Sequence, residues 1–154
     1  MSLTIVSVAE ITKAVQQQLM GHPLMNGVSV TRSEQITNNA SECPWIGIYR
    51  ARVQYPIRVL GNMGQGRYQR SNLVLVCQET SGSSGAECED KLETLVANTL
   101  IALYDNPFLK PDDNSPGVID YIDEIEVNYK SYTQTDNVFM QQVNLYITTV
   151  SRTN

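Results

Sequence analysis

The apolar residues near the start of the chain recur at intervals of three and four, which is the spacing of one face of an α-helix. This pattern predicts a helix over residues 7–20, capped by Ser7 and ended by Gly21 and Pro23. The apolar positions of this helix are Val8, Ile11, Val15 and Leu19. Its polar positions, expected on the exposed face, are Thr12, Lys13, Gln16 and Gln17.

Alternating apolar and polar residues then predict two strands, a short one over residues 28–34 and a longer one over residues 47–59. In the longer strand the odd positions are mostly apolar, and the arginines at even positions are expected to share one face. These arginines are Arg50, Arg52 and Arg58. Because Pro56 cannot donate a ladder hydrogen bond, this strand is expected at an edge of the sheet or as a projecting arm beyond that point.

A glycine-rich turn at residues 61–66 leads into a further extended segment over residues 67–79. The centre of this segment, residues 73–77, is apolar at every position, which is typical of a strand buried on both faces. We therefore expect a long hairpin whose second strand runs through the middle of the sheet.

A second helix is predicted after a serine- and glycine-rich stretch at residues 81–85, which has the composition of a flexible linker. The apolar face of the helix runs from Leu92 to Leu103, and the helix is expected to end before Pro107. Acidic residues at its start suit the positive end of the helix dipole. They are Glu87, Glu89 and Asp90.

Two final strands close the chain, joined by a predicted hairpin turn at residues 131–137. The first has apolar residues on one parity, namely Ile119, Tyr121, Ile125, Val127 and Tyr129. Its other parity is acidic, namely Asp120, Glu124 and Glu126. Asp123 breaks the alternation, which predicts a β-bulge. The last strand turns Phe139, Val143, Leu145 and Ile147 inward, and Gln142, Asn144 and Thr148 outward.

Together these elements predict one α+β domain over residues 1–154. The expected architecture is an antiparallel β-sheet with a long projecting β-hairpin, packed against two α-helices. Glu10 and Lys13 interrupt the first apolar run, and no later run approaches the roughly 18 apolar residues of a membrane-spanning helix. We therefore expect a protein without a membrane partner, made in a cytoplasm.

The charges of the chain are strongly segregated. Residues 43–78 contain no Asp or Glu and five arginines, whereas the formal charge of the whole chain is -5. The rest of the chain therefore sums to -5 minus +5, or -10. The five arginines are Arg50, Arg52, Arg58, Arg67 and Arg70. Such a molecule is expected to meet an acidic surface, which could belong to a second copy of itself.

The arginine-rich stretch also contains aromatic residues, among them Tyr49 and Tyr55. Charged strand faces often serve only to keep sheet edges from aggregating. However, arginine favours bidentate contacts with carboxylates and phosphates, and arginine together with aromatic residues is the typical composition of a protein interface. The five arginines with Tyr49 and Tyr55 are therefore predicted to contact a neighbouring subunit or another protein. The acidic face formed by Asp120, Glu124 and Glu126 is the candidate partner surface.

Familiar catalytic and cofactor patterns are weak in this sequence. The glycines at 61, 64 and 66 precede a strand, whereas a nucleotide-binding loop opens a helix. His22 follows a helix end, where capping is common, and no nucleophile is spaced to use it. The 3 cysteines and 1 histidine lack the spacing of a zinc site. The acidic face lacks a calcium loop. We expect a protein that is not an enzyme and binds no metal or cofactor.

The order of these elements resembles the tail terminator proteins of long-tailed bacteriophages. The resemblance covers most of the chain. It is carried by the short first helix, the Cys-Pro-Trp-Ile-Gly-Ile-Tyr entry at residues 43–49 into an arginine-bearing hairpin, the Leu-Val-Leu-Val strand at residues 73–76, the long second helix and the acidic closing hairpin.

That resemblance implies a structural virion protein that forms a ring, hexameric in this family, at the end of the tail tube. The implied partners are further copies of the chain, the tail tube protein and the connector or stopper protein of the head. DNA passes through such a ring without specific binding, and Asp120, Glu124 and Glu126 could line the bore or face the next subunit. The implied location is the neck of the virion, after assembly in the host cytoplasm.

Other readings of the sequence remain open. One is another position in the same neck, such as a connector adaptor or a head-closure stopper. Another is a nucleic-acid-binding module, with arginines on phosphates and tyrosines on bases. A sequence pI near 4.8 argues against the second of these, because it opposes non-specific binding to a polyanion.

Overall fold

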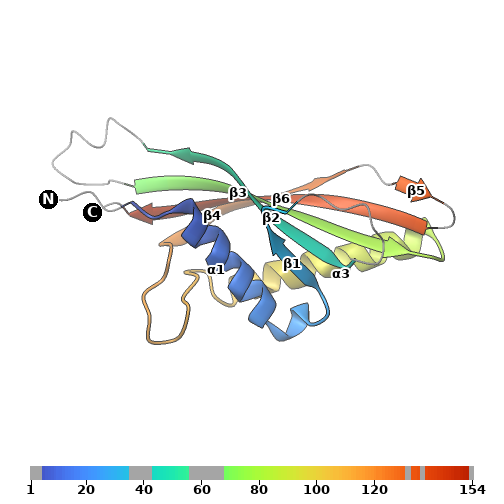
Figure 1. Ribbon diagram of the computed structural model, residues 1–154, viewed down its shortest axis with the longest axis horizontal. Helices are drawn as coiled ribbons and strands as arrows, with labels where there is room; N and C mark the ends of the chain where they lie inside the picture. Colours follow the sequence, from blue (N-terminus) through green and yellow to red (C-terminus); the bar gives the residue numbers. More distant parts are fainter. Residues whose placement is uncertain (1–4, 35–42, 56–67, 131–132, 136–137, 153–154) are drawn as a thin grey trace, which may run out of the picture.

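A computed structural model describes residues 5–34, 43–55, 68–130, 133–135 and 138–152. The elements follow in the order α1 (Val8–Gly21), the short 3-10 helix η1 (Pro23–Met25), β1 (Ser29–Arg32), β2 (Trp45–Gln54), β3 (Tyr68–Ser81), α3 (Gly85–Tyr104), β4 (Tyr121–Tyr129), β5 (Thr133–Thr135) and β6 (Val138–Arg152). Both α-helices lie on the same side of one twisted sheet (Figure 1). The predicted α+β class with two helices against a sheet is confirmed.

The strands are arranged in the order β1-β2-β3-β6-β4, with β5 pairing only with β6. All neighbours are antiparallel except β1 and β2, which are parallel. The sheet is therefore mixed, and the expectation of a purely antiparallel sheet is wrong at this one edge. The cause is that β1 and β2 are joined by residues 33–44, a connection long enough to return the chain to the same end of the sheet.

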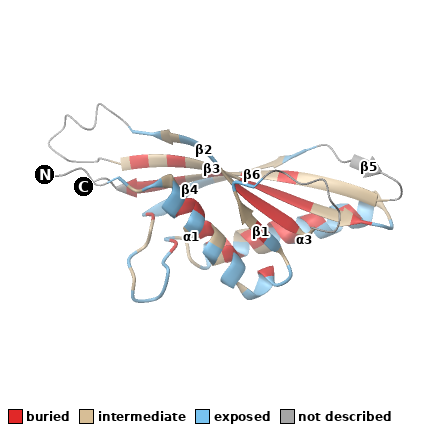
Figure 2. Cartoon of the chain, viewed as in Figure 1, coloured by how far each residue is buried: buried red, intermediate tan, exposed pale blue. Residues whose placement is uncertain are grey.

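The longest pairing joins β3 to β6, from Tyr68–Arg152 to Ser81–Phe139. Its central side chains on the helix side are fully buried and form the middle of the core. They include Leu73, Leu75, Leu145 and Ile147. Figure 2 shows buried residues running along these central strands and along the facing sides of both helices. This confirms the central strand predicted at residues 73–77 and the inward residues predicted for the last strand.

Helix α1 begins where the sequence predicts, because the Ser7 side chain accepts a hydrogen bond from the Ala9 N–H at 3.2 Å. One predicted exposed residue is wrong: Thr12 is buried, with its hydroxyl donating to the Ala9 carbonyl at 3.0 Å. A threonine hydroxyl that donates to a carbonyl of its own helix can be buried without leaving an unpaired polar group. The polarity of Thr12 therefore did not require exposure to solvent. His22 caps η1 by accepting from the Leu24 N–H, in keeping with its predicted capping role.

The segment before α3 is an ordered turn rather than the predicted flexible linker. The Ser81 hydroxyl accepts hydrogen bonds from the N–H groups of Ser83 and Ser84, and the Ser84 hydroxyl caps α3 by accepting from Glu87 N at 3.0 Å. The prediction of a flexible linker was wrong because serine is common both in flexible linkers and at helix N-caps, so composition alone does not distinguish the two.

Strands β2 and β4 each contain one extra residue. In β4 the register shifts between Ile122 and Glu124, so Asp123 is the bulge that the sequence predicts. In β2 the register shifts between Arg50 and Arg52, which makes Ala51 a bulge that the sequence did not predict. A bulge changes which residues share a face, so both shifts alter the arrangement of the charged side chains.

The far end of the predicted hairpin, including Pro56, Arg58, the glycine turn and Arg67, lies outside the described residues. Within the described part, β2 and β3 pair from Trp45–Gln78 to Gln54–Arg70. The predicted turn at residues 131–137 is wrong in part, because Thr133–Thr135 forms a strand that pairs with β6.

Candidate interface on the two edges of the sheet

The two faces of the sheet differ in what covers them. One face packs against α1 and α3, and the opposite face carries neither helix (Figure 1). Cross-strand register assigns side chains to faces, because residues directly opposite each other point the same way. By this rule the buried Ile48, Leu75, Leu145 and half-buried Val127 define the helix face. The alternating residues define the helix-free face.

The bulge at Ala51 separates two arginines that the sequence predicts on one face. Arg50 is opposite the buried Leu73 and lies on the helix face, beside Ala9 and Arg32. Arg52 is opposite Asn72, which lies on the helix-free face. The prediction of a shared face is therefore wrong for this pair, because the extra residue moves Arg52 out of step with Arg50.

Arg70 also lies on the helix-free face, but it already has an acidic partner in the same chain. Its Nη2 atom lies 2.6 Å from Oδ2 of Asp123, the bulged residue of β4. By contrast, Arg50 and Arg52 are exposed and form no ion pair with any residue that the structure describes. Of the three arginines of the predicted patch that the structure describes, Arg52 is therefore the one that is exposed on this face without a described ion-pair partner.

The two tyrosines predicted with the arginines differ in their surroundings. Tyr49 is half-buried on the helix-free face, and its hydroxyl donates to the Glu34 carbonyl at 2.5 Å. Burial, followed by the nearby Glu34 carboxylate, raises the pKa of the Tyr49 phenol. Tyr55 follows β2 and is 42% exposed. Tyr55 is thus available to a partner, whereas Tyr49 is engaged within the subunit.

The acidic residues lie on the opposite edge of the sheet. Glu124 and Glu126 are exposed on β4, opposite Thr148 and Tyr146 of β6, so they share the helix-free face with Arg52. Asp120 directly precedes β4, and its N–H donates to the Val150 carbonyl at 2.9 Å. Tyr121 is opposite Val150 and belongs to this same face, not to the apolar face predicted for it, because the Asp123 bulge intervenes.

Tight packing on the helix-free face surrounds Trp45. Its indole N–H donates to the Thr31 hydroxyl at 3.0 Å, and its ring covers Gly47 so closely that a Cβ atom there would lie 2.5 Å from the ring. Farther along the sheet the polar side chains form a ladder. Gln78 donates to Gln142 at 3.1 Å, and Gln142 donates to Asn144 at 3.0 Å. The helix-free face thus combines buried apolar side chains such as Trp45 and Val76 with an ordered row of polar side chains.

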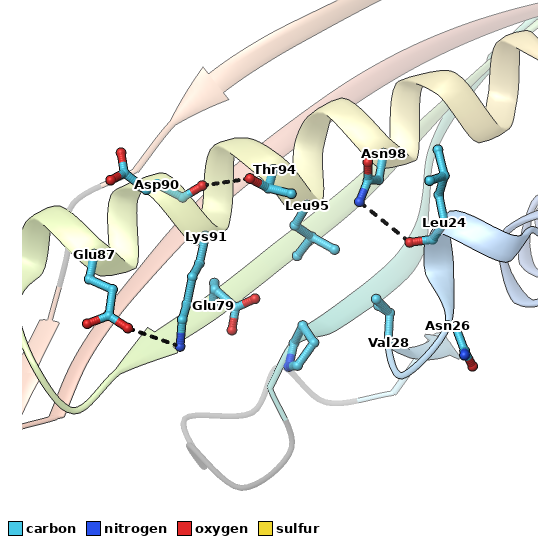
Figure 3. Close-up of a pocket in the computed structure, with 11 residues that line it drawn as sticks. Leu24, Asn26, Val28, Glu79, Glu87, Asp90, Lys91, Thr94, Leu95 and Asn98 are labelled. Atoms are coloured by element: carbon cyan, nitrogen blue, oxygen red, sulfur yellow. Dashed lines mark hydrogen bonds and ion pairs between the residues drawn. The ribbon is translucent and has the colours of Figure 1, made fainter.

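A separate groove lies between α3, η1 and the end of β3, and none of the predicted site residues lines it. It has a volume of about 490 Å³, with Glu79, Glu87, Asp90 and Lys91 among its polar walls (Figure 3). Lys91 lies 3.7 Å from Glu87, and burial raises the pKa of the Glu79 carboxyl. The groove was missed because its walls come from segments far apart in the sequence. With three carboxylates and one lysine, the groove has a negative formal charge of its own, on the β1 side of the sheet and away from β4.

Neither described helix is long and apolar enough to cross a membrane. Among the described residues, no group of three or more His, Cys, Asp or Glu side chains is arranged to hold a metal ion. Searches for known relatives found no protein-family model that matches this chain and no similar curated protein.

Proposed function

We propose that this chain is a structural virion protein that assembles into a ring at the end of a bacteriophage tail tube and offers a docking surface to the head connector. The resemblance of the sequence to tail terminator proteins motivates the proposal. The structural observation that carries it is the position of the charges: exposed Arg52, which has no ion-pair partner among the described residues, lies on the part of β2 beyond β1, and exposed glutamates lie on β4 at the opposite edge.

A closed ring requires a different patch on each side of the subunit, because every copy meets its left and right neighbours through different surfaces. Two oppositely charged edges of one sheet meet that requirement. Arg52 and Glu124 lie on the same face and in the same cross-strand row, through Asn72 and Thr148. The position of Glu124 and Glu126 on an edge strand favours contact with a neighbour over a place in the bore.

The test is the assembly state of the purified chain. We expect a single large species by size-exclusion chromatography with light scattering, and rings of uniform diameter by negative-stain microscopy. Addition of the tail tube protein should place these rings at tube ends. A strict monomer, even with the tube protein present, would contradict the proposal. Rings that bind the connector but never the tube would instead indicate an adaptor or stopper.

A nucleic-acid-binding role finds less support in this geometry. Such a surface needs several positive charges together, and among the arginines of the patch that the structure describes, Arg50 and Arg52 face opposite ways while Arg70 is paired with Asp123. We expect no salt-sensitive binding of labelled DNA or RNA by fluorescence anisotropy at about 50 mM salt. Tight binding that weakens steeply with salt would favour the nucleic-acid role.

A further inference from the structure

We infer that the exposed part of β2 binds the β4 edge of a second copy of this chain, so that Arg52 of one copy meets Glu124 and Glu126 of the next. This inference rests on the proposed ring and specifies its subunit contact. It commits the partner to another copy, because both halves of the contact are present on the same chain.

The first support is that both edges are open. Strand β1 covers only Trp45–Ile48 of β2, and the last backbone bond on that side among the described residues is from Ser33 N to the Ile48 carbonyl at 2.9 Å. From Arg50 to Gln54, no strand in the described part of the chain pairs with the outer side of β2. The outer side of β4 is likewise without a strand partner among the described residues. Open edges are templates for pairing with another chain.

The second support is strand direction. Strand β2 is antiparallel to β3, β3 is antiparallel to β6, and β6 is antiparallel to β4. Strand β4 therefore runs opposite to β2. If a second copy lies beside the first with its sheet facing the same way, its β4 approaches β2 as an antiparallel neighbour. Antiparallel pairs have the better hydrogen-bond geometry.

The third support is that the opposite charges lie on the same face and in the same cross-strand row of the sheet. Arg52 and Glu124 lie on one row but are separated by β3 and β6, so about 14 Å of sheet lies between them at the usual strand spacing. They cannot reach each other within one subunit. In a neighbour placed edge to edge, the same two side chains come onto adjacent strands, where opposite charges attract.

The charges on β2 and β4 also disfavour contacts between two identical strands of neighbouring copies. Two β4 edges would bring glutamates together, and two β2 edges would bring arginines together, and like charges on neighbouring strands are unfavourable. Only the mixed contact joins opposite charges. Charge on an edge normally prevents association, but here it prevents only the symmetric contacts and permits the head-to-tail contact.

Exposed tyrosines accompany the charges on both edges. Tyr121 is 48% exposed on β4, and Tyr55 is 42% exposed just beyond the end of β2. Tyr121 lies on the row of Gln54, through Val150 and Arg70, so Tyr55 and Tyr121 fall at neighbouring levels of the sheet. Tyrosine is enriched in protein interfaces because its ring buries apolar area while its hydroxyl stays bonded.

The experiment is a charge swap read by light scattering and microscopy. Arg52→Glu alone, and Glu124→Arg with Glu126→Arg, should each weaken self-association about a hundredfold, since like charges across an interface cost several kcal/mol. Mixing the two variants should restore assembly, because every contact in an alternating ring then joins opposite charges. Lys13→Glu, an equal reversal at an exposed position of α1, should leave assembly unchanged.

The outcomes separate this contact from the ring itself. Circular dichroism and thermal melts establish that each variant is folded. If the wild type forms rings and folded Arg52→Glu also forms them, the edge contact is wrong and the ring proposal stands. If mixing the variants fails to restore assembly, the pairing of these two edges is wrong. If the wild type never self-associates at any soluble concentration, even with the tail tube protein present, both proposals are overturned.

Discussion

The guanidinium of Arg70 and the carboxylate of Asp123 form an ion pair across β6, with Nη2 and Oδ2 2.6 Å apart. The pair joins the arginine-rich segment of the chain to its acidic segment inside one subunit. Both side chains remain about one-third exposed, so solvent screens their attraction. This pair therefore differs from Arg52 and Glu124, which lie too far apart to meet within one copy.

Arg70→Ala should lower the free energy of unfolding by no more than about 1 kcal/mol, as is usual for partly exposed ion pairs. It should leave assembly intact, because Arg70 is already neutralised by Asp123. Urea unfolding followed by circular dichroism measures the first effect and light scattering the second. Loss of assembly in Arg70→Ala, with Arg52→Ala unaffected, would reverse the assigned roles of the two arginines.

Gln69→Leu should destabilise the fold by about 1–3 kcal/mol, the usual penalty for buried polar groups left unpaired. The Gln69 amide donates to the Val6 carbonyl at 2.8 Å and accepts from the Val6 N–H at 3.2 Å, so it holds the segment before α1 against β3. The side chain is fully buried. Chemical denaturation measures the loss, and an unchanged midpoint would show that Val6 finds other partners.

Gly47→Ala should displace the Trp45 ring, because the added Cβ would lie 2.5 Å from it. We expect a loss of about 1–3 kcal/mol, as for other overpacked sites, and a red shift in fluorescence from Trp45, the 1 tryptophan of the chain. The matched control is Gly21→Ala, where no atom lies within 4 Å of the new Cβ. Equal spectra and stabilities for the two variants would contradict this packing.

Glu79→Gln should stabilise the protein at neutral pH. Burial raises the pKa of Glu79 above its ordinary 4.5, so the folded state binds a proton at a higher pH than the unfolded chain does. The charged carboxylate therefore lowers stability above the folded-state pKa, and this penalty disappears as the pH falls through that value toward 4.5. Thermal melts of both proteins across this range should converge at the acidic end.

The control for that experiment is Glu89→Gln, an exposed position on α3. Exposed substitutions of this kind usually change stability by less than about 0.5 kcal/mol. A stabilisation by Glu79→Gln that persists unchanged at acidic pH would show that its origin is not the buried charge.

Thiol reagents should modify Cys77 and Cys88 only when the protein unfolds. Both side chains are fully buried, and burial raises the pKa of Cys77 to about 12, which leaves almost no reactive thiolate at neutral pH. Half-buried Cys43 should react first. Mass spectrometry after brief labelling measures the order. Fast labelling of Cys77 in the native protein would contradict its place in the core.

The helices and the central strands could be predicted because the apolar residues of each element follow a regular spacing over many positions. Ser7 marks the start of α1, and an unbroken apolar run marks the middle of β3. It was harder to predict which face of the sheet each charged residue of β2 and β4 lies on, because one inserted residue moves every later side chain of the strand to the opposite face. Asp123 could be found, since a charged residue visibly breaks the alternation. Ala51 could not, because alanine fits either face.

The candidate interface was predicted in part. Arg52, Glu124 and Glu126 were identified from their charge and from the alternation of the predicted strands, and the structure places them on β2 and β4 on one face of the sheet. The pairing of Arg70 with Asp123 was not predicted, because it joins residues 53 positions apart and depends on the register of three strands. The sequence predicts a short first strand and a longer second one, but it does not predict that the two pair with each other over only four residues.

The two bulges have a mechanical consequence. They lie at neighbouring rungs of the sheet, where β2 and β4 each gain a residue beside the Asn72–Thr148 pair. Bulges increase the local right-handed twist of a strand. Strands β2 and β4 are therefore both expected to twist more strongly beside this pair. In the proposed contact, a neighbouring strand would have to follow this twist along residues 50–54, the stretch of β2 that β1 leaves uncovered.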